Sequence, residues 1–270
     1  MYSRTVAAAA VIVALAGSVL AQNANLSALQ TGDDARGWEA VGRLDIDGKG
    51  FCTGALIAPD IVLTAAHCMF ESGTGDRIDP TRIEFQAGLR NGRAAAYRDV
   101  AEAVIPVGYT FNATVSNAMT RQDVALLRLS RPIRLATIAP FETVGALPAG
   151  AQVGIVSYAH DRAEAPSIEQ ACDVLGEQDG VHVLACSVDF GSSGAPIFLI
   201  EDGQARIASV VSAKAYLDDR PVALGTSLAA PLAELMAELS SGMGRFQAAP
   251  RVRIIGGGER ADTGAKFVRP

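Results

Sequence analysis

The sequence predicts an all-β protein, and three observations support this class. Between residues 40 and 228 the chain consists of short apolar runs separated by glycine, proline, aspartate and asparagine. These runs recur roughly every 10 to 25 residues, a spacing typical of β-sandwiches and β-barrels. Long amphipathic helices between the runs, the signature of an α/β protein, are absent. Since 49% of the 270 residues are hydrophobic and 6% are aromatic, the core should consist mainly of Ala, Val, Ile and Leu.

The expected strands are short, and most begin or end at a turn residue. In chain order they read VGRLDID, FCTGALIA, IVLTA, RIEFQAG, VALLRL, QVGIVSY, VHVLAC, APIFLI and RIASVVSA. One helix is expected after them, over residues 229–240, where apolar residues recur at helical spacing. These residues are Leu232, Leu235, Met236 and Leu239. Pro231 in the first turn and Gly242 just beyond the end are typical helix boundary signals.

The N-terminus indicates export. Residues 1–21 contain a basic residue, Arg4, then an apolar run over 6–20, and end in the small residue Ala21. This is the pattern of a cleaved secretory signal peptide. The apolar run is shorter than the roughly 20 residues that a membrane span needs. We therefore expect a secreted or periplasmic protein with no membrane span after signal removal.

The distribution of charge bears on the partners of the protein and on its C-terminal end. The formal net charge of -6 argues against a nucleic-acid binder. Residues 241–270 contain several arginines and only two acidic residues, Glu259 and Asp262, and we expect a flexible, solvated tail. We expect the protein to be a monomer.

Four cysteines in an exported chain indicate two disulfides. Three pairings are possible, and we favour the sequential one, Cys52 with Cys68 and Cys172 with Cys186. Each then closes a loop worth on the order of 3 kcal/mol in chain entropy. No cysteine or histidine cluster has the spacing of a metal site, so no metal is expected. The remaining histidines, His160 and His182, read as ordinary surface or strand residues.

Three stretches carry chemically useful residues. They are VLTAAHC at 62–68, RQDVALLRL at 121–129 and FGSSGAP at 190–196. The first places a histidine after an apolar strand, and the second places an aspartate at the start of one. The third is a glycine-bracketed loop that can present a serine hydroxyl and aim backbone N–H groups at one point. A serine nucleophile needs an adjacent base, and the base needs a third group to orient it.

Together these stretches resemble the trypsin- and chymotrypsin-like serine peptidases. TAAHC, DVALL and GSSGAP match that family's histidine, aspartate and serine motifs, and FCTGALIAPDIVLTAAHC matches as a block. The resemblance implies two packed six-stranded antiparallel β-barrels with a C-terminal helix, in a domain over residues 38–240. Barrel one would cover about 38–132 and barrel two about 145–228, preceded by a short segment, 22–37.

The resemblance also assigns roles to individual residues. His67 would be the general base, Asp123 would orient it and Ser193 would be the nucleophile. The backbone N–H groups of Gly191 and Ser193 would form the oxyanion hole. Ser212 would hydrogen-bond near Asp123 and offer its carbonyl group to the substrate. The resemblance implies the same two disulfides, Cys52–Cys68 and Cys172–Cys186, and it implies no cofactor.

Two positions near the nucleophile depart from the family pattern. Ser192 stands where many members have an aspartate that pairs with a newly released N-terminus, and the chain lacks the matching Ile-Val-Gly-Gly start. We hypothesise that the enzyme folds in an active form without cleavage near Arg36. Ala195 replaces a glycine, which is a small change at ordinary backbone angles and a costly one at positive φ.

The specificity pocket is less well determined. By spacing, Ser187 would lie at the pocket base and Asp189 would point elsewhere, so specificity for Arg or Lys is not expected. Ala213 and Lys214 would form the pocket wall. Lys214 could attract an acidic side chain, or it could lie solvated along the rim, which we favour. The expected function is a secreted serine endopeptidase acting on polypeptides; the alternative is a non-catalytic relative that serves as a binding module.

Overall fold

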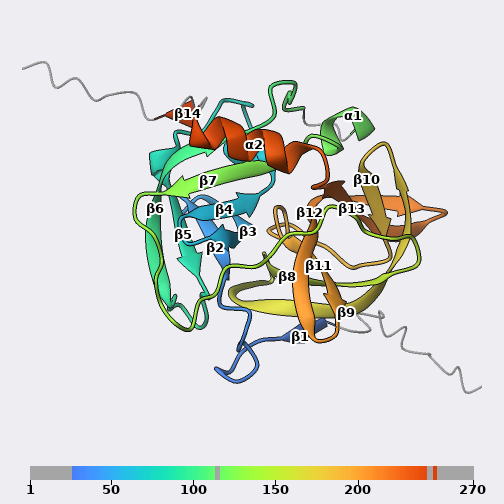
Figure 1. The fold of residues 1–270 in the computed structure, drawn as a ribbon, viewed down its shortest axis with the longest axis horizontal. Helices are drawn as coiled ribbons and strands as arrows, with labels where there is room; N and C mark the ends of the chain where they lie inside the picture. The colour runs from blue at the N-terminus through green and yellow to red at the C-terminus, as the bar shows by residue number, and fades with distance from the viewer. Residues whose placement is uncertain (1–25, 113–115, 242–245, 248–270) are drawn as a thin grey trace, which may run out of the picture.

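The computed structural model describes residues 26–112, 116–241 and 246–247. The expected signal peptide and most of the expected tail lie outside these residues. The described chain forms two antiparallel sheets, and each sheet closes on itself as a six-stranded barrel (Figure 1). This confirms the predicted all-β class and the two-barrel arrangement.

The first barrel has the strand order β6-β5-β2-β3-β4-β7, and pairing of β6 with β7 closes it. Its strands are β2 (Val41–Ile46), β3 (Gly50–Ala58), β4 (Ile61–Thr64), β5 (Ile83–Ala87), β6 (Ala96–Val104) and β7 (Ala125–Leu129). Apolar residues alternate with polar ones in β5, as expected for a strand with one face in the core. A short strand, β14 (Phe246–Gln247), extends this sheet beyond β6, so the expected flexible tail contributes one ordered pairing.

The second barrel has the strand order β9-β10-β13-β12-β11-β8, and pairing of β8 with β9 closes it. Its strands are β8 (Gln152–Ala159), β9 (Arg162–Gln178), β10 (Val181–Leu184), β11 (Pro196–Glu201), β12 (Gln204–Leu217) and β13 (Arg220–Ser227). The N-terminal strand β1 (Leu26–Ala28) pairs with β9 outside the barrel. The N-terminal segment is therefore attached to the second barrel, although the first barrel follows it in the chain.

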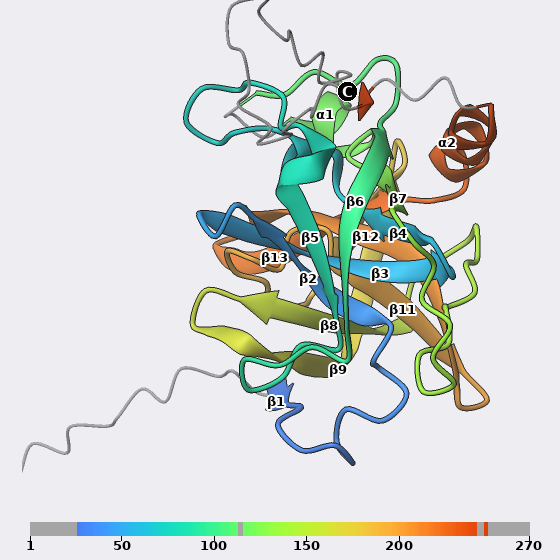
Figure 2. The same cartoon turned by 90° about the vertical axis from the view of Figure 1, so that its left-hand side faces the viewer.

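Helices are few in the described residues. The main one is α2 (Pro231–Ser240), and short turns occur at η1 (Ala66–Met69), η2 (Pro80–Arg82) and α1 (Asn117–Thr120). Although α2 follows the second barrel, it lies against β6 and β7 of the first one (Figure 2). Arg128 of β7 donates a hydrogen bond to the carbonyl oxygen of Leu239. The helix thus connects the end of the second barrel to the first barrel. No helix in this part of the chain is long and apolar enough to cross a membrane.

Aromatic and polar contacts join the two barrels. Phe198 of β11 packs edge-on against Trp38 and Phe141, with ring centroids 5.0 and 4.7 Å away. The hydroxyl of Tyr158 in β8 donates to the carbonyl oxygen of Leu89, 2.9 Å away. These contacts hold the barrels in one relative position, which matters because the candidate site takes residues from both.

Candidate active site

A cleft of about 880 Å³ lies between the barrels and contains most of the predicted site residues. His67 and Cys68 of the first barrel line it, together with Gly191 and Ser193 of the second. Ser212, Ala213 and Lys214 of β12 line it too. Three segments far apart in the sequence therefore meet in one cavity.

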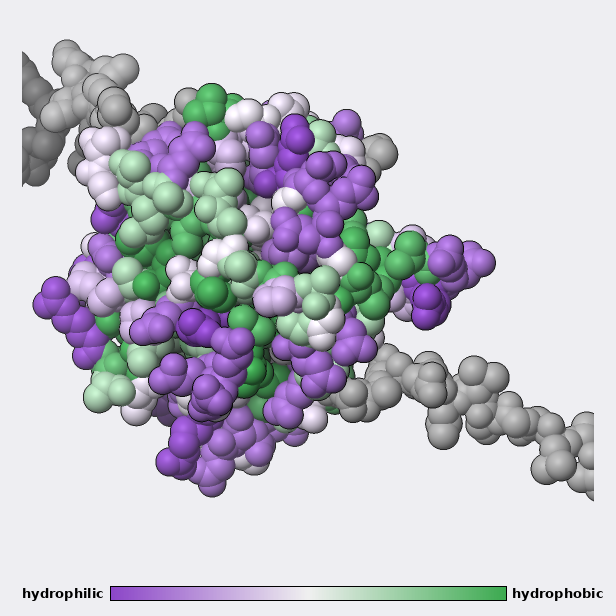
Figure 3. Space-filling model, turned by 45° about the vertical axis from the view of Figure 1, so that its right-hand side comes forward, coloured by the Kyte–Doolittle hydropathy of each residue, from purple (hydrophilic) through white to green (hydrophobic). Residues whose placement is uncertain are grey.

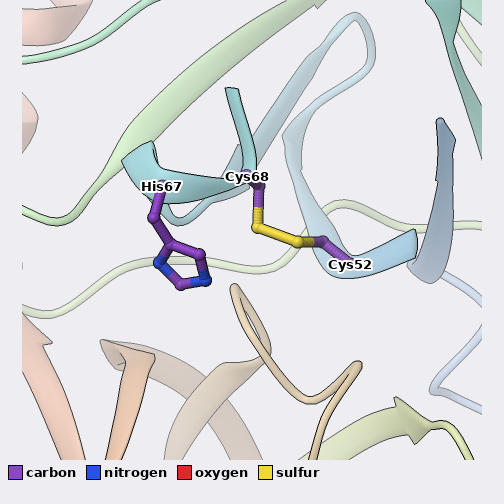
Figure 4. Close-up of side chains that lie close together, drawn as sticks. All are labelled: Cys52, His67 and Cys68. Atoms are coloured by element: carbon purple, nitrogen blue, oxygen red, sulfur yellow. A yellow bond between two sulfur atoms is a disulfide. The ribbon is translucent and has the colours of Figure 1, made fainter. Parts of the chain in front are cut away.

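His67 is positioned by a short turn and a disulfide. Strand β4 ends at Thr64, and the 3₁₀ turn η1 follows it directly. Cys68 of this turn is bonded to Cys52 of β3, which fixes the turn against the barrel (Figure 4). The side chain of His67 remains 21% exposed and reaches the cleft. Both predicted disulfides are confirmed, since Cys172 is bonded to Cys186.

Cys52, His67 and Cys68 also form the one group of potential metal ligands found close together in the described chain. The sulfur atoms of Cys52 and Cys68 and a ring nitrogen of His67 lie within 4.8 Å of one another. The two sulfur atoms are joined to each other, so neither is a thiolate. Because only the thiolate is a metal ligand, this group is a disulfide beside a histidine rather than a metal centre.

Asp123 is fully buried and holds His67 at two points. Its Oδ2 lies 2.7 Å from the Nδ1 atom of His67, and its Oδ1 accepts the backbone N–H of His67 at 2.8 Å. A carboxylate can only accept, so the Nδ1 atom carries the proton and the Nε2 atom keeps a free lone pair. Burial lowers the pKa of His67, but the charge and hydrogen bond of Asp123 outweigh it and leave the pKa raised.

Residues of the second barrel complete the surroundings of Asp123. The hydroxyl of Ser212 donates to Oδ2 at 2.5 Å. Ser212 lies at an irregularity of β12, where the register with β13 shifts between Val211 and Ala213. Such a bulge re-aims a side chain, here toward the carboxylate. Thr226 of β13 donates to the carbonyl oxygen of Thr120, just before Asp123.

Tyr109 is a further neighbour that sequence reasoning missed. Its side chain is buried. Burial raises the pKa of its hydroxyl, and the negative charge of Asp123 raises it further. Tyr109 therefore stays neutral beside Asp123. No local sequence signal marks it, because it lies in a loop without a motif.

The loop that carries Ser193 depends on two glycines. Gly191 and Gly194 have φ angles of 95° and 77°, which side-chain-bearing residues rarely adopt. A Cβ atom on Gly194 would lie 2.4 Å from the carbonyl oxygen of Thr53. The N–H of Gly194 donates to the carbonyl oxygen of Val211. The N–H groups of Gly191 and Ser193 have no acceptor in the described chain, as an oxyanion hole requires.

Thr53 of the first barrel anchors this loop, and the sequence analysis did not identify it. Its N–H donates to the carbonyl oxygen of Ser193 and its hydroxyl to that of Gly191, both at 2.8 Å. The hydroxyl also accepts the N–H of Tyr158 at 3.1 Å. Thr64 in turn donates to the carbonyl oxygen of Thr53. The only signal for Thr53 in the sequence is its position next to Cys52.

The two positions that depart from the family pattern are accommodated locally. Ser192 is fully buried, and its hydroxyl lies 3.2 Å from that of Ser157 and 3.4 Å from the carbonyl oxygen of Tyr158. The position therefore has neutral partners and contains no carboxylate that needs a cation. Ala195 is buried and does not have a positive φ, so its methyl group imposes no backbone strain.

The pocket residues divide into two groups. Ala213 and Lys214 line the cleft as expected. Ser187 does not line it; it is exposed, and its N–H donates to the buried Glu169. Asp189, expected to point elsewhere, lines the cleft, and its Oδ1 accepts the N–H of Phe190. Phe190 was not predicted as a site residue, and 83% of it is exposed at the cleft.

One contact of the predicted triad is not formed. Among the residues that the structure describes, the hydroxyl of Ser193 has no hydrogen bond with His67. Both line the same cleft. Hydrogen bonds of catalytic groups are often long in the free enzyme and shorten when substrate is bound. The histidine–aspartate half of the site is therefore formed, and the serine stands beside it.

Comparison with known proteins identifies similar peptidases. Brachyurin of Leptuca pugilator is 31% identical over 119 residues, which are 44% of this chain and 47% of brachyurin. The chain thus spans about half the length of this curated relative. A solved Glu endopeptidase is similar with a TM-score of 0.65 and 18% identity, over 80% of this chain and 97% of that chain.

A second solved structure, the inactivated protease paralogue S-D1 of the scabies mite, has a TM-score of 0.61 and 16% identity. The similarity covers 78% of this chain and 95% of that one. At such identities these two structures support the fold alone. The sequence model of the trypsin-like peptidase domain matches residues 52–206, which include His67, Asp123 and Ser193. The match covers more than half of the chain, and the chain belongs to the family of trypsin-like peptidase domains.

Proposed function

We propose that this protein is an exported serine endopeptidase that cleaves polypeptides through His67, Asp123 and Ser193. The observation that carries the proposal is the buried Asp123 carboxylate on the Nδ1 side of His67, in the cleft that Ser193 lines. This arrangement leaves the Nε2 atom of His67 free to accept a proton on the side of the cleft.

In the proposed reaction the Ser193 hydroxyl oxygen attacks the carbonyl carbon of the scissile bond while His67 takes its proton. The N–H groups of Gly191 and Ser193 stabilise the resulting oxyanion, and each such donor is typically worth ~10²–10³ in rate. His67 then protonates the leaving amine, which leaves an acyl group on Ser193. A water molecule, deprotonated by His67, hydrolyses this acyl-enzyme and restores the free serine.

The signal-like N-terminus, the two disulfides and the family of the chain support action outside the cytoplasm. Ser192 and its neutral partners support activity without a cleavage step, because no carboxylate needs a released N-terminus. The pocket does not by itself select a side chain, since Asp189 and Lys214 carry opposite charges in the same cleft.

The experiment is fluorophosphonate labelling of the purified mature protein, with Ser193→Ala as the control. Only the wild type is expected to be labelled, because a fluorophosphonate reacts with a serine only when that serine is activated. Cleavage of the oxidised insulin B chain should accompany labelling. If folded protein is neither labelled nor active, before or after limited proteolysis near Arg36, the endopeptidase proposal is wrong and the binding-module alternative is favoured.

A further inference from the structure

We propose that Glu169 is a positioning residue for the nucleophile loop, residues 188–193, and that it holds the start of this loop through the N–H of Ser187. This inference rests on the proposed function, because it concerns the placement of the Ser193 hydroxyl and of the oxyanion-hole N–H groups. No motif of the sequence indicates this role for Glu169.

Glu169 is conspicuous because it is buried. Glu169 and Asp123 are the buried carboxylates of the described chain, and Asp123 already has a place in the candidate site. The other carboxylates described are at least partly exposed, and hydrophilic residues form much of the outline of the molecule (Figure 3). A buried carboxylate is costly unless it is hydrogen-bonded or paired. The partner of Glu169 therefore indicates where this side chain acts.

That partner is the backbone just before the nucleophile loop. The Oε2 atom of Glu169 accepts the N–H of Ser187 at 2.7 Å. Burial raises the pKa of Glu169, whereas the Ser187 N–H and the positive charge of Arg162 lower it, and burial prevails. The hydrogen bond thus lies in surroundings of low polarity, where a carboxylate is a stronger acceptor than in water.

The strand that carries Glu169 is fixed on both sides. At this residue β9 pairs with β1 on one side and with β8 on the other. Further along the same strand, Cys172 is bonded to Cys186. Strand β9 therefore holds two consecutive residues, Cys186 by a disulfide and Ser187 by a hydrogen bond.

The chain enters the cleft directly after Ser187. The loop residues that line the cleft are Val188, Asp189, Phe190, Gly191 and Ser193. The N–H groups of Asp189 and Phe190 donate to side chains of the loop itself. The bond from Ser187 to Glu169 is thus the hydrogen bond that attaches the start of the loop to the second barrel.

The two ends of the loop are held from different barrels. Thr53 of the first barrel bonds the carbonyl oxygens of Gly191 and Ser193, and Glu169 of the second barrel holds the start. The N–H groups of an oxyanion hole must point at one position. A displacement of about 1 Å can cost on the order of 10²-fold in rate. A loop held at one end alone should therefore lower kcat even in a folded protein.

The test compares Glu169→Asp with Glu169→Gln. Aspartate keeps the charge but withdraws the acceptor by about 1.5 Å, whereas glutamine keeps the acceptor and removes the charge. For a synthetic peptide spanning the main cleavage site of the oxidised insulin B chain, Glu169→Asp should lower kcat about tenfold, with a smaller change in KM. Glu169→Gln should retain about a third or more of the wild-type kcat.

Glu102→Asp is the matched control. The largely buried Glu102 carboxylate of β6 lies 3.4 Å from the Nε atom of Arg128, and neither residue lines the cleft. The same shortening there should leave kcat unchanged, whatever it does to the stability of the first barrel. A wild-type kcat for Glu169→Asp, or equal losses of kcat for Glu169→Asp and Glu169→Gln, would overturn the inference.

Amide hydrogen exchange measures the loop independently of activity. Residues 187–193 should exchange about tenfold faster in Glu169→Asp than in the wild type, and at close to the wild-type rate in Glu169→Gln. Unchanged exchange in Glu169→Asp would overturn the inference, and peptide cleavage by the wild type would leave the proposed function intact. Faster exchange in Glu169→Asp, with a wild type that neither cleaves peptides nor reacts with a fluorophosphonate, would contradict the proposed function instead.

Discussion

The two halves of the site are held in different ways. On the first barrel, a side-chain hydrogen bond joins His67 to the buried carboxylate of Asp123, and Ser212 of the second barrel adds another. On the second barrel, the nucleophile loop is held by backbone groups, two glycines at positive φ and the partner residue Thr53. The first half is therefore held by a buried charged hydrogen bond, and the second is held by the backbone conformation of a loop.

Because of this difference, mutations in the two halves should affect activity and stability differently. A change in the histidine–aspartate half should alter the chemistry and its pH dependence and leave the fold intact. A change in the nucleophile loop should move the backbone and affect stability and activity together, because the same hydrogen bonds join the two barrels.

The largest effect is expected from Asp123→Asn. An amide cannot hold the Nδ1–H tautomer of His67 as the carboxylate does, so kcat should fall about 10⁴-fold. The measurement is peptide hydrolysis with circular dichroism to verify the fold. Ser193→Ala is the matched control for complete loss of the nucleophile. A decrease of less than tenfold would show that Asp123 does not orient His67.

Gly194→Ala should come next. The new methyl group would lie 2.1 Å from the Thr64 hydroxyl and 2.4 Å from a backbone carbonyl, at a φ of 77°. We expect at least ~100-fold lower kcat/KM and a loss of about 2 kcal/mol or more in unfolding free energy. Gly203→Ala is the control, because its φ is 76° with open space around it. Equal destabilisation by both changes would mean that strain alone, and not the clash, sets the cost.

Thr53→Val tests the contact between the two halves. It keeps the side-chain shape but removes the hydroxyl that bonds Gly191 and Tyr158. We expect about tenfold lower kcat and a loss of about 1–3 kcal/mol in unfolding free energy. Thr226→Val, which affects the loop of Asp123 instead, is the matched comparison. If Thr53→Val changes neither quantity, the nucleophile loop does not depend on the first barrel.

The pH dependence of activity and stability should depend on the histidine–aspartate half, and its effect should be smaller than those of the mutations above. His67 must be neutral to act as a base, and its pKa is raised, so activity should fall on acidification from a pH above the ordinary value of about 6.5. The raised pKa also means that the protonated pair stabilises the fold below about pH 6.5, an effect lost as the pH rises through the folded-state pKa. Thermal unfolding of Ser193→Ala across pH measures the second effect. A kinetic pKa below 6.5 would contradict this reading of the Asp123 contact.

The smallest effect on activity should come from cutting after Arg36. Since Ser192 needs no cationic partner, mature protein beginning at Gln22 should gain no activity from the cut. Stability should decrease, because β1 leaves β9 and the buried Leu29 is exposed, a loss of about 1.5–3 kcal/mol. Activity assays and melting curves before and after limited proteolysis measure both. Activation by the cut would show that the protein is made as an inactive precursor.

Several strands could not be predicted from local pattern. The run AYRDVAEAV of β6 contains three alanines and a glutamate, which favour helix, but it pairs with β5 and β7. Strand β9 is 17 residues long, contains Pro166 and has Ala171 at a φ of 60°. Strand β13 contains Pro221, which lies opposite Tyr216 of β12. In each case the neighbouring strand, and not the residue itself, imposes the extended backbone.

What the sequence determined on its own is the chemistry: an all-β chain, the candidate residues His67, Asp123 and Ser193, and cysteines that pair in order. Such features can be predicted locally, because each depends on a short motif or on the number of residues between two positions. The tertiary structure decided what depends on distance, such as Thr53 beneath Ser193, Tyr109 beside Asp123, and Asp189 in the cleft in place of Ser187. These contacts join residues of different strands or different barrels, and only the closing of both sheets brings them together.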